Sequence, residues 1–217
     1  MISLKLIQKI LPQCCEADAI DILRLADREK EQLSEYMSDF KTVIVLAHHV
    51  KHSLEWTWFS FDSARTGAIP PADLHLEAEA QKLINLFDKE GFNSILIPYP
   101  GISGIRFKDL ANQTGLGKIG DNFLFLHKEW GPWTHLRIIL TDTEVSECLD
   151  PCNEVCIHCG ACEIACPANA IQKEELLGNK CGAYQNSLTS NNIYELECEK
   201  CIRACPIGIA PKEIHIS

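Results

Sequence analysis

Cysteines are the residues of this 217-residue chain whose number and spacing most clearly indicate chemistry. There are twelve, and ten of them lie from Cys148 onward. Clustered cysteines indicate disulfides or metal ligands, whereas cysteines that serve as small buried hydrophobes would be scattered. The chain is acidic and its first residues do not read as a secretory signal peptide, so metal binding is favoured over disulfides.

The first run of cysteines has the form C-x2-C-x2-C-x3-C-P. In two-cluster ferredoxins, the first three cysteines of such a run bind one cubane 4Fe–4S cluster and the fourth binds the other. Gly160 allows close backbone approach, and Pro167 turns the chain away after the fourth ligand. The run consists of Cys156, Cys159, Cys162 and Cys166.

A second run has the form C-x2-C-x3-C-P and is one cysteine short of the first. The isolated Cys181 completes the count. The spacing therefore predicts two 4Fe–4S clusters that exchange their fourth ligands. We expect the first cluster to bind Cys156, Cys159, Cys162 and Cys205, and the second to bind Cys166, Cys181, Cys198 and Cys201.

Zinc is the alternative metal, because C-x2-C pairs also bind zinc. Zinc sites rarely use a four-cysteine run that ends in Cys-Pro, which favours the clusters. Three roles remain open for Cys148 and Cys152: a third metal site, a redox pair, or ordinary packing. The adjacent Cys14 and Cys15 are expected at a helix end as small hydrophobic side chains.

Composition narrows the classes of partner. The net charge of −10 disfavours nucleic acid, whose phosphates require basic side chains. From Glu144 onward there are 11 Asp and Glu against 5 Lys and Arg, or −6 in that segment. This acidic surface suits a basic redox partner protein, although a solvated face is the simpler interpretation. No apolar run is long enough to span a membrane, and a cytoplasmic location is expected.

The first half of the chain alternates between helical and strand patterns. Apolar residues at helical spacing predict a helix over 4–11, ended by Pro12, and a second over 18–37, with Ile20, Leu23, Leu25 and Leu33 facing the core. A β-branched run over 42–50 predicts a buried strand. A loop over 51–71 precedes a helix that Asp73 is expected to cap and Gly91 to close. A strand over 93–98 then completes a βαβ-like unit.

The second half begins with a turn at 98–101 and a short helix over 108–114. Gly115, Gly117 and Gly120 form a glycine-rich loop, and strands are predicted over 122–127 and 135–141 around a Gly-Pro turn. The loop is not a dinucleotide fingerprint, because a helix and not a strand leads into it. We place the boundary between an α/β domain, 1–147, and a cluster module, 148–217, near Cys148.

Three further groups have residue types that suit a site. The first group lies at the end of the first predicted strand, where α/β folds form sites, and consists of His48, His49 and His52. The alternative interpretation is that these histidines are structural. Arg65 and Arg106 suit a carboxylate or propionamide, or form surface ion pairs. A cluster of aromatic side chains could line a flat cofactor pocket, or it could fill a core or a subunit interface. The cluster consists of Trp56, Trp58, Phe59 and Phe61.

The order of motifs in the second half resembles the epoxyqueuosine reductase family. The resemblance rests on Gly115-Leu-Gly-Lys-Ile-Gly-Asp-Asn122, on Gly131-Pro-Trp133, on Ile139-Leu-Thr-Asp142, and on the cysteine layout with its isolated Cys181. It extends roughly over residues 40–210 and is strongest from about residue 107. The family usually has Trp where Lys118 stands and an acid where a gapless count places Gly101.

The resemblance implies a fold, cofactors and an activity. Members are cobalamin-dependent iron–sulfur enzymes related to reductive dehalogenases, so the expected fold is α+β: a nitroreductase-like α/β domain followed by a ferredoxin-like module with two 4Fe–4S clusters. Electrons would pass through the clusters to cobalamin or another small-molecule acceptor. Gly115, Gly117, Gly120 and Asn122 would approach the corrin. The longer members carry a helical-repeat extension for tRNA, which does not follow the last cysteine motif here.

These observations predict an iron–sulfur oxidoreductase of epoxyqueuosine reductase type. Two alternatives remain: a non-catalytic electron carrier or activator of a corrinoid protein, and an enzyme that reduces epoxyqueuosine in tRNA. The catalytic residues are not identified by the sequence.

Overall fold

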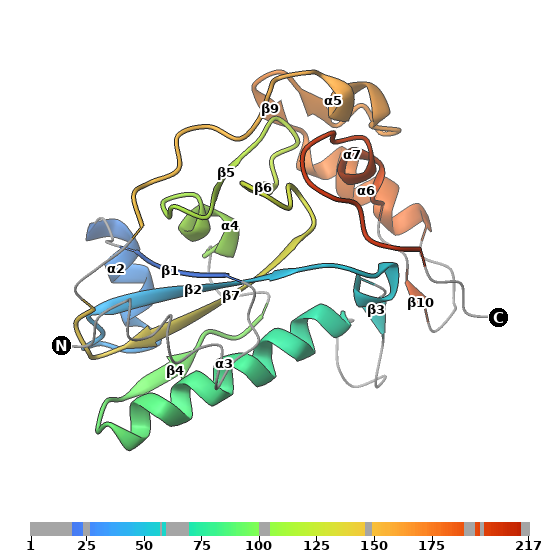
Figure 1. The fold of residues 1–217 in the computed structure, drawn as a ribbon. Coiled ribbons are helices and arrows are strands. Elements are labelled where there is room, and N and C mark those ends of the chain that lie inside the picture. Colours follow the sequence, from blue (N-terminus) through green and yellow to red (C-terminus); the bar gives the residue numbers. More distant parts are fainter. Residues whose placement is uncertain are drawn as a thin grey trace.

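The computed structural model describes residues 19–23, 27–56, 58–59, 70–99, 105–145, 149–188, 194–195 and 198–213. Their centre is a four-stranded sheet in the order β1-β2-β7-β4 (Figure 1). All neighbouring strands are antiparallel, so β2 and β4 run parallel with β7 between them. The predicted βαβ-like unit is therefore present but split by β7. The strands are β1 (Ala19–Leu23), β2 (Thr42–His49), β7 (Thr134–Thr141) and β4 (Ser94–Leu96).

The long central strand β2 is covered on both faces. Val43, Val45 and Ala47 point to one core, and Ile44 and Leu46 point to the other. A strand buried on both faces is apolar without alternation, which explains why this run was predicted as a buried strand. The prediction over 42–50 is confirmed.

Helix α3 (Pro71–Lys89) covers one face of the sheet (Figure 1). It buries Leu76, Ala80, Leu83 and Phe87 against that face at helical spacing. Gly91, with φ +82°, follows the helix end as predicted. The prediction that Asp73 caps the helix is wrong. Pro70 is the N-cap, and Asp73 lies inside the first turn, where it is buried and paired with side chains of β7.

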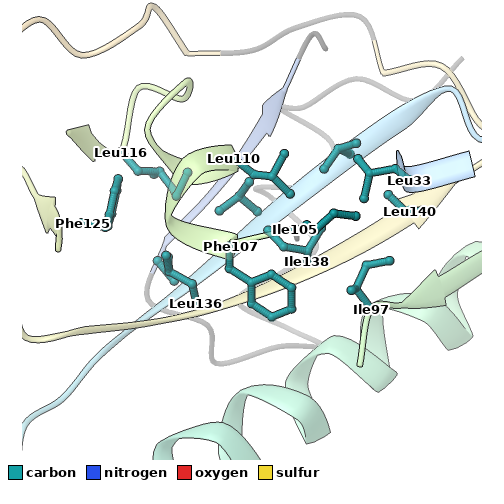
Figure 2. Close-up of a cluster of buried hydrophobic side chains, with 14 residues drawn as sticks. Leu33, Ile97, Ile105, Phe107, Leu110, Leu116, Phe125, Leu136, Ile138 and Leu140 are labelled. Atoms are coloured by element: carbon teal, nitrogen blue, oxygen red, sulfur yellow. The ribbon is translucent and has the colours of Figure 1, made fainter. Parts of the chain in front are cut away.

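The other face packs against α2 (Asp27–Ser34), α4 (Phe107–Ala111) and the segment between α4 and β7. Figure 2 shows this core, in which Leu33, Phe107 and Leu110 meet Leu136 and Ile138 of β7. α4 corresponds to the short helix predicted over 108–114. The predicted helix over 4–11 lies outside the described residues.

The second predicted helix, over 18–37, is wrong in its first half. Residues 19–23 form β1, which pairs with β2 from Ala19 to Leu23. Ile20 and Ile22 face the α3 core, and the fully buried Asp21 points to the opposite side. This is a strand alternation with a period of two, so the assignment of Ile20 to a helical stripe is wrong. Leu33 on α2 is buried as expected.

A small hairpin follows α4. β5 (Gly117–Ile119) pairs with β6 (Phe125–His127), so residues predicted as a glycine loop form a short strand. The strand predicted over 122–127 begins only at Phe125, because Gly120 to Leu124 make the hairpin turn. The strand predicted over 135–141 is confirmed as β7.

The cysteine-rich module lies at one end of the sheet, beyond the hairpin (Figure 1). Its elements are short, and its buried hydrophobic side chains among the described residues are Cys162, Ala170 and Ile171. An antiparallel pair joins it to the segment after β2. The elements are α5 (Ala161–Ala165), β8 (Ile171–Gln172), β9 (Glu175–Leu176), α6 (Gly178–Leu188) and α7 (Lys200–Arg203), with β10 (Tyr194–Glu195) pairing β3 (Trp58–Phe59) after the 3₁₀ turn η1 (Ser53–Trp56).

Among the described residues, no helix is both long enough and apolar enough to cross a membrane. The boundary placed near Cys148 stays a prediction; Cys148 itself lies outside the described residues.

Candidate functional site

Four cysteines from both runs meet in one hollow beside the β5–β6 hairpin. They are Cys156, Cys159, Cys162 and Cys205, the same four that the spacing assigns to the first cluster. Gly160 takes φ +72° between Cys159 and Cys162, a left-handed conformation that glycine adopts without strain. This turn starts α5 and brings the three thiols of the first run to one side.

The other four cysteines also lie close to one another. Burial, together with a smaller effect of the neighbouring Cys198, Cys181 and Cys166, raises the pKa of the Cys201 thiol to about 12. The four come from the end of α5, from α6 and from the start of α7. Ionised thiols this close repel each other, and a bound cation or iron cluster removes that cost by ligating them as thiolates.

Cys166 sits in a nest of backbone donors. Burial opposes its ionisation, yet the backbone N–H groups that follow it outweigh burial and lower the pKa of the Cys166 thiol. The Ala170 N–H donates to the Cys166 Sγ at 3.2 Å. Hydrogen bonds to ligating sulfurs help to set the reduction potential of iron–sulfur clusters. Two groups of four thiols thus have the donor set that two 4Fe–4S clusters require.

The predicted corrin-contacting glycines lie in close packing on the hairpin. A Cβ on Gly115 would meet the Asp150 carbonyl oxygen at 2.4 Å, and one on Gly117 would meet that of Leu126 at 2.0 Å. A Cβ on Gly120 would meet the Leu126 side chain at 2.4 Å. Gly115 thus lets the start of the hairpin approach the chain that enters the module, whereas Gly117 and Gly120 let the hairpin pack closely on its own second strand.

Asn122, predicted with these glycines, lies at the first group of cysteines. It is buried, lines that hollow, and accepts a hydrogen bond from the Leu124 N–H. Neither Asn122 nor any of the three glycines lines the larger cavity described next. Their contact with a corrin stays a prediction.

A larger cavity of about 280 Å³ lies between the module and the end of the sheet where β7 begins. Trp56, Tyr99 and Phe107 contribute aromatic rings from the α/β domain. Cys198, from the second group of cysteines, lines the cavity from the module side. A concave, mostly apolar site with a few polar groups is the usual form of a small-molecule site.

Four ionisable side chains line this cavity besides Cys198: Tyr99, Lys108, His135 and Glu199. The Lys108 Nζ donates to the Phe123 carbonyl oxygen at 2.5 Å. Burial lowers the pKa of Lys108, and the nearby Arg106 lowers it further, against a smaller opposing effect of Asp109.

Glu199 and His135 each have a charged partner beside the cavity. Arg203 Nη2 lies 2.6 Å from the Glu199 Oε2, and Asp73 Oδ1 lies 2.8 Å from the His135 Nε2. Sequence reasoning did not single out Lys108, His135, Tyr99 or Glu199. In the structure, His135 lies on the face of β7 that packs against α3, and nothing in the local sequence indicated a cavity there.

The other candidate residues divide between structural roles and the cavity. His48 pairs with Glu55 and lies against the ring of His75, and His49 stacks on Trp130. His52 is exposed, and Arg106 pairs with Asp109 on the surface. Trp56 lines the cavity and also packs on Trp133.

Several candidates cannot be placed. Arg65, Phe61, Cys14 and Cys15 lie outside the described residues, as do the side chains of Trp58 and Phe59. Cys152 is partly buried, and its N–H donates to the Thr114 carbonyl oxygen, which leaves its role open.

Comparison with known proteins first defines the class of the module. Residues 155–209 match the 4Fe-4S dicluster domain family, and this range contains all eight cysteines of the two groups. The C-terminal part of the chain is therefore an iron–sulfur module of the two-cluster type, which favours iron–sulfur clusters over zinc.

Sequence relatives match a longer part of the chain than the module. The chain is 27% identical over 143 residues to an epoxyqueuosine reductase of Prochlorococcus marinus, covering 60% of this chain and 46% of that protein. It is 30% identical over 121 residues to an epoxyqueuosine reductase of Vibrio cholerae, covering 50% and 32%. The chain thus spans less than half the length of these curated relatives.

Solved structures agree on the fold. Epoxyqueuosine reductase from Streptococcus thermophilus superposes with a TM-score of 0.71 at 20% identity, covering 99% of this chain and 69% of that one. An epoxyqueuosine reductase solved with a modified tRNA stem loop gives 0.69 at 15%, covering 93% and 65%. A reductive dehalogenase, described as B12-dependent, gives 0.61 at 17%, covering 88% and 30%. The predicted resemblance and the predicted α+β fold class are confirmed.

Proposed function

We propose that the chain is an iron–sulfur oxidoreductase that passes electrons through two 4Fe–4S clusters to an acceptor bound in the 280 Å³ cavity. The observation that carries the proposal is the position of Cys198. This cysteine belongs to the second group of thiols and also lines the cavity. An acceptor in the cavity would lie directly beside a ligand of the second cluster.

The two groups of cysteines differ in exposure, which gives the relay a direction. Cys159 of the first group is exposed to solvent. The first cluster would therefore be the one that a redox partner protein reaches, and the second cluster would pass electrons inward. In this proposal Cys156, Cys159, Cys162 and Cys205 hold the first cluster, and Cys166, Cys181, Cys198 and Cys201 hold the second.

A corrinoid is the acceptor that the relatives favour. The rings of Trp56, Tyr99 and Phe107 offer flat apolar surfaces to a conjugated ring. A volume of about 280 Å³ is at the lower end of small-molecule sites, so the cavity takes only part of a corrinoid. When bound, the corrinoid would supply the low-potential reducing centre, and the protein would supply binding, orientation and protons.

Reduction of an epoxide on tRNA is the second candidate, because a structural neighbour was solved with a modified tRNA stem loop. The net charge of −10 predicts weak binding to tRNA. A gel-shift titration at low salt tests it: a shift that disappears with added salt supports tRNA as substrate, and no shift at low salt excludes it.

Corrinoid uptake tests the proposed function. Protein purified without oxygen is incubated with hydroxocobalamin and passed through a desalting column, and iron and cobalt are counted. We expect about eight iron atoms, from four ligands per cluster, and about one cobalt. Leu124→Trp would place a larger side chain in the cavity and is expected to abolish retention of cobalt while iron is kept.

A matched variant controls for the size of the new side chain. Leu86 is also partly buried, but it packs on the α3 core away from the cavity. Leu86→Trp should retain cobalt as the unaltered protein does. Eight iron atoms with no retained cobalt in the unaltered protein would contradict corrinoid binding and favour the non-catalytic electron carrier.

A further inference from the structure

His135 is a histidine held in place by a buried carboxylate at the wall of the cavity. It stands near the start of β7 and lines the cavity. Its Nε2 lies 2.8 Å from the Asp73 Oδ1. Among the described residues, no hydrogen bond is made by its other ring nitrogen, Nδ1. The hydrogen bond to Asp73 assigns the tautomer with the proton on Nε2 when the ring is neutral.

The partner of His135 is itself fixed. Asp73 is 2% exposed and belongs to the first turn of α3. The Arg137 Nε lies 3.4 Å from the Asp73 Oδ1, and the Arg137 Nη1 donates to the Ile97 carbonyl oxygen. The ring of Tyr99 lies 5.1 Å from that of His135 and also packs under the Arg137 guanidinium. The imidazole is therefore held from two sides.

Two other ionisable side chains of the cavity wall have their polar ends occupied. Lys108 donates to the Phe123 carbonyl oxygen, and Glu199 pairs with Arg203. The charged and titratable groups around His135 come from several elements: Asp73 of α3, with Glu77 paired to Arg137, His48 of β2, Arg137 of β7, Tyr99 after β4, and Lys108, Cys198 and Glu199 of the cavity wall.

We infer that His135 is the proton donor for the reduction that takes place in the cavity, with Asp73 as its positioning residue. The inference rests on the proposed function, which supplies electrons but not protons. Reductive opening of a carbon–oxygen bond needs both. For an epoxide, two electrons from the two reduced clusters and two protons convert the ring to an alkene and water.

The proton transfer follows from this balance. As the first carbon–oxygen bond breaks, the oxygen keeps the electron pair and takes the proton from His135 Nδ1; as the second breaks, the oxygen leaves as water and the two carbons form the double bond. The imidazolium becomes neutral and is protonated again from solvent, which also supplies the second proton. The two electrons would come one from each cluster held by the two groups of cysteines, and a low-potential one-electron donor would replace them. Asp73 stabilises the imidazolium before transfer and keeps Nδ1 toward the cavity.

A purely structural role is the alternative. In that case the ion pair fastens the start of α3 to β7, and its loss lowers stability without changing the chemistry. His48 provides a matched control, because it lies beside His135 on β2, faces α3, and also pairs with a carboxylate, that of Glu55. It does not line the cavity.

The test compares His135→Gln, His135→Ala and His48→Gln in protein loaded with both clusters and hydroxocobalamin. Titanium(III) citrate is the reductant, and the probes are styrene oxide and an epoxyqueuosine-modified tRNA stem loop. We expect His135→Gln to lose about 100-fold or more in alkene formation, as for a lost general acid. Its cluster content and rate of cluster reduction should stay unchanged, and added imidazole should restore turnover to His135→Ala.

Two further readouts separate chemistry from structure. The turnover of the unaltered protein should fall as pH rises, because the proton donor is then lost, and His135→Gln should show no such fall. Diethyl pyrocarbonate labelling read by mass spectrometry should modify His135 but not His48, and bound hydroxocobalamin should protect His135. The labelling needs no turnover.

Several outcomes would overturn the inference. These are activity of His135→Gln within threefold of the unaltered protein, an unchanged pH profile, or equal losses in activity and cluster content in His135→Gln and His48→Gln. Failure to label His135 would contradict its position at the cavity. If the unaltered protein binds corrinoid but converts neither epoxide, the proton-donor role falls and the relay stands. If it binds no corrinoid, the proposed function fails first.

Discussion

The α/β domain and the cysteine-rich module are held together by different forces. The domain buries two layers of aliphatic side chains against its sheet, and β2 and β7 are buried along nearly their whole length. In the module, α6 and α7 bury no residue, and Ile157 and Ile164 are exposed. Burial of apolar surface is the main favourable term in folding, so the domain has a core of its own, and we expect the module to depend on the groups that its cysteines bind.

Removal of iron should have the largest effect, because it should unfold the module and leave the domain folded. Anaerobic chelation is expected to unfold the module, because eight cysteines lose the groups that join them. Hydrogen exchange measured by mass spectrometry should show fast exchange over residues 156–205 and continued protection in β2 and β7. Loss of protection in β2 would show that the domain also depends on the clusters, and a protected module would show that it does not need them.

Asp21 should give the next largest effect, because it joins the domain to the chain that enters the module. It is fully buried and accepts hydrogen bonds from the N–H groups of Ile22, Gly115 and Leu149. Asp21→Ala leaves these donors without their acceptor, at about 1–3 kcal/mol for each one that stays buried. Urea unfolding should show a loss of about 3 kcal/mol or more.

Asp39 gives the control for this substitution. It is exposed, and Asp39→Ala should change the free energy of unfolding by no more than about 0.5 kcal/mol. Equal effects of the two substitutions would mean that the Asp21 hydrogen bonds do not stabilise the junction.

Two glycines allow the backbones of the domain and the module to pack closely against each other. Gly131 has φ +60°, and a Cβ there would lie 2.0 Å from the Ile207 carbonyl oxygen. Gly208 has φ +85° and meets the Trp130 backbone in the same way. Gly131→Ala should therefore cost more than the roughly 1–2 kcal/mol of a left-handed alanine, because backbone must also move.

The matching control is Gly91→Ala. Gly91 has φ +82° but nothing within 4 Å of its Cβ position, so it should show the conformational cost alone. Thermal unfolding and limited proteolysis near residue 207 measure both variants. If Gly131→Ala and Gly91→Ala are equally destabilised and equally resistant to protease, the close contact between the two regions does not contribute to stability.

The smallest expected effect is the dependence of stability on the protonation of Lys108, which lies where the domain faces the module. Burial lowers its pKa, so the folded protein releases this proton at lower pH than the unfolded chain does. The resulting cost to stability is present near neutral pH and disappears as pH rises through the lowered pKa toward 10.5. The pH midpoint of acetic anhydride labelling should be lower for Lys108 than for the exposed Lys173. Coincident midpoints would contradict the burial of Lys108.

The two regions also differ in what their sequences predict. The cysteine spacing predicts two sets of four, and the structure brings the same sets together, because ligand spacing is a local constraint of the cluster. The strands β2 and β7 were predicted from their long apolar runs. β1 was missed because Ile20 and Ile22 alone fit either a helix or a strand.

The cavity could not be predicted. Its wall combines Trp56, Tyr99, His135 and Cys198, which are far apart in the sequence and meet only through the sheet and the docking of the module. Asp73 was taken for a helix cap because an acid near a helix start usually has that role. Its pairing with His135 depends on the register of β7 against α3, which no local pattern contains.

Electron transfer from the clusters to a corrinoid bound in the cavity tests the account most directly. Protein with both clusters reduced is mixed with hydroxocobalamin without oxygen in a stopped-flow spectrometer. If the relay ends in the cavity, the cluster absorbance recovers at the same rate as the corrinoid spectrum changes, and Leu124→Trp slows both together. Clusters that stay reduced while corrinoid is bound, or equal rates in Leu124→Trp, would contradict a relay that ends in this cavity.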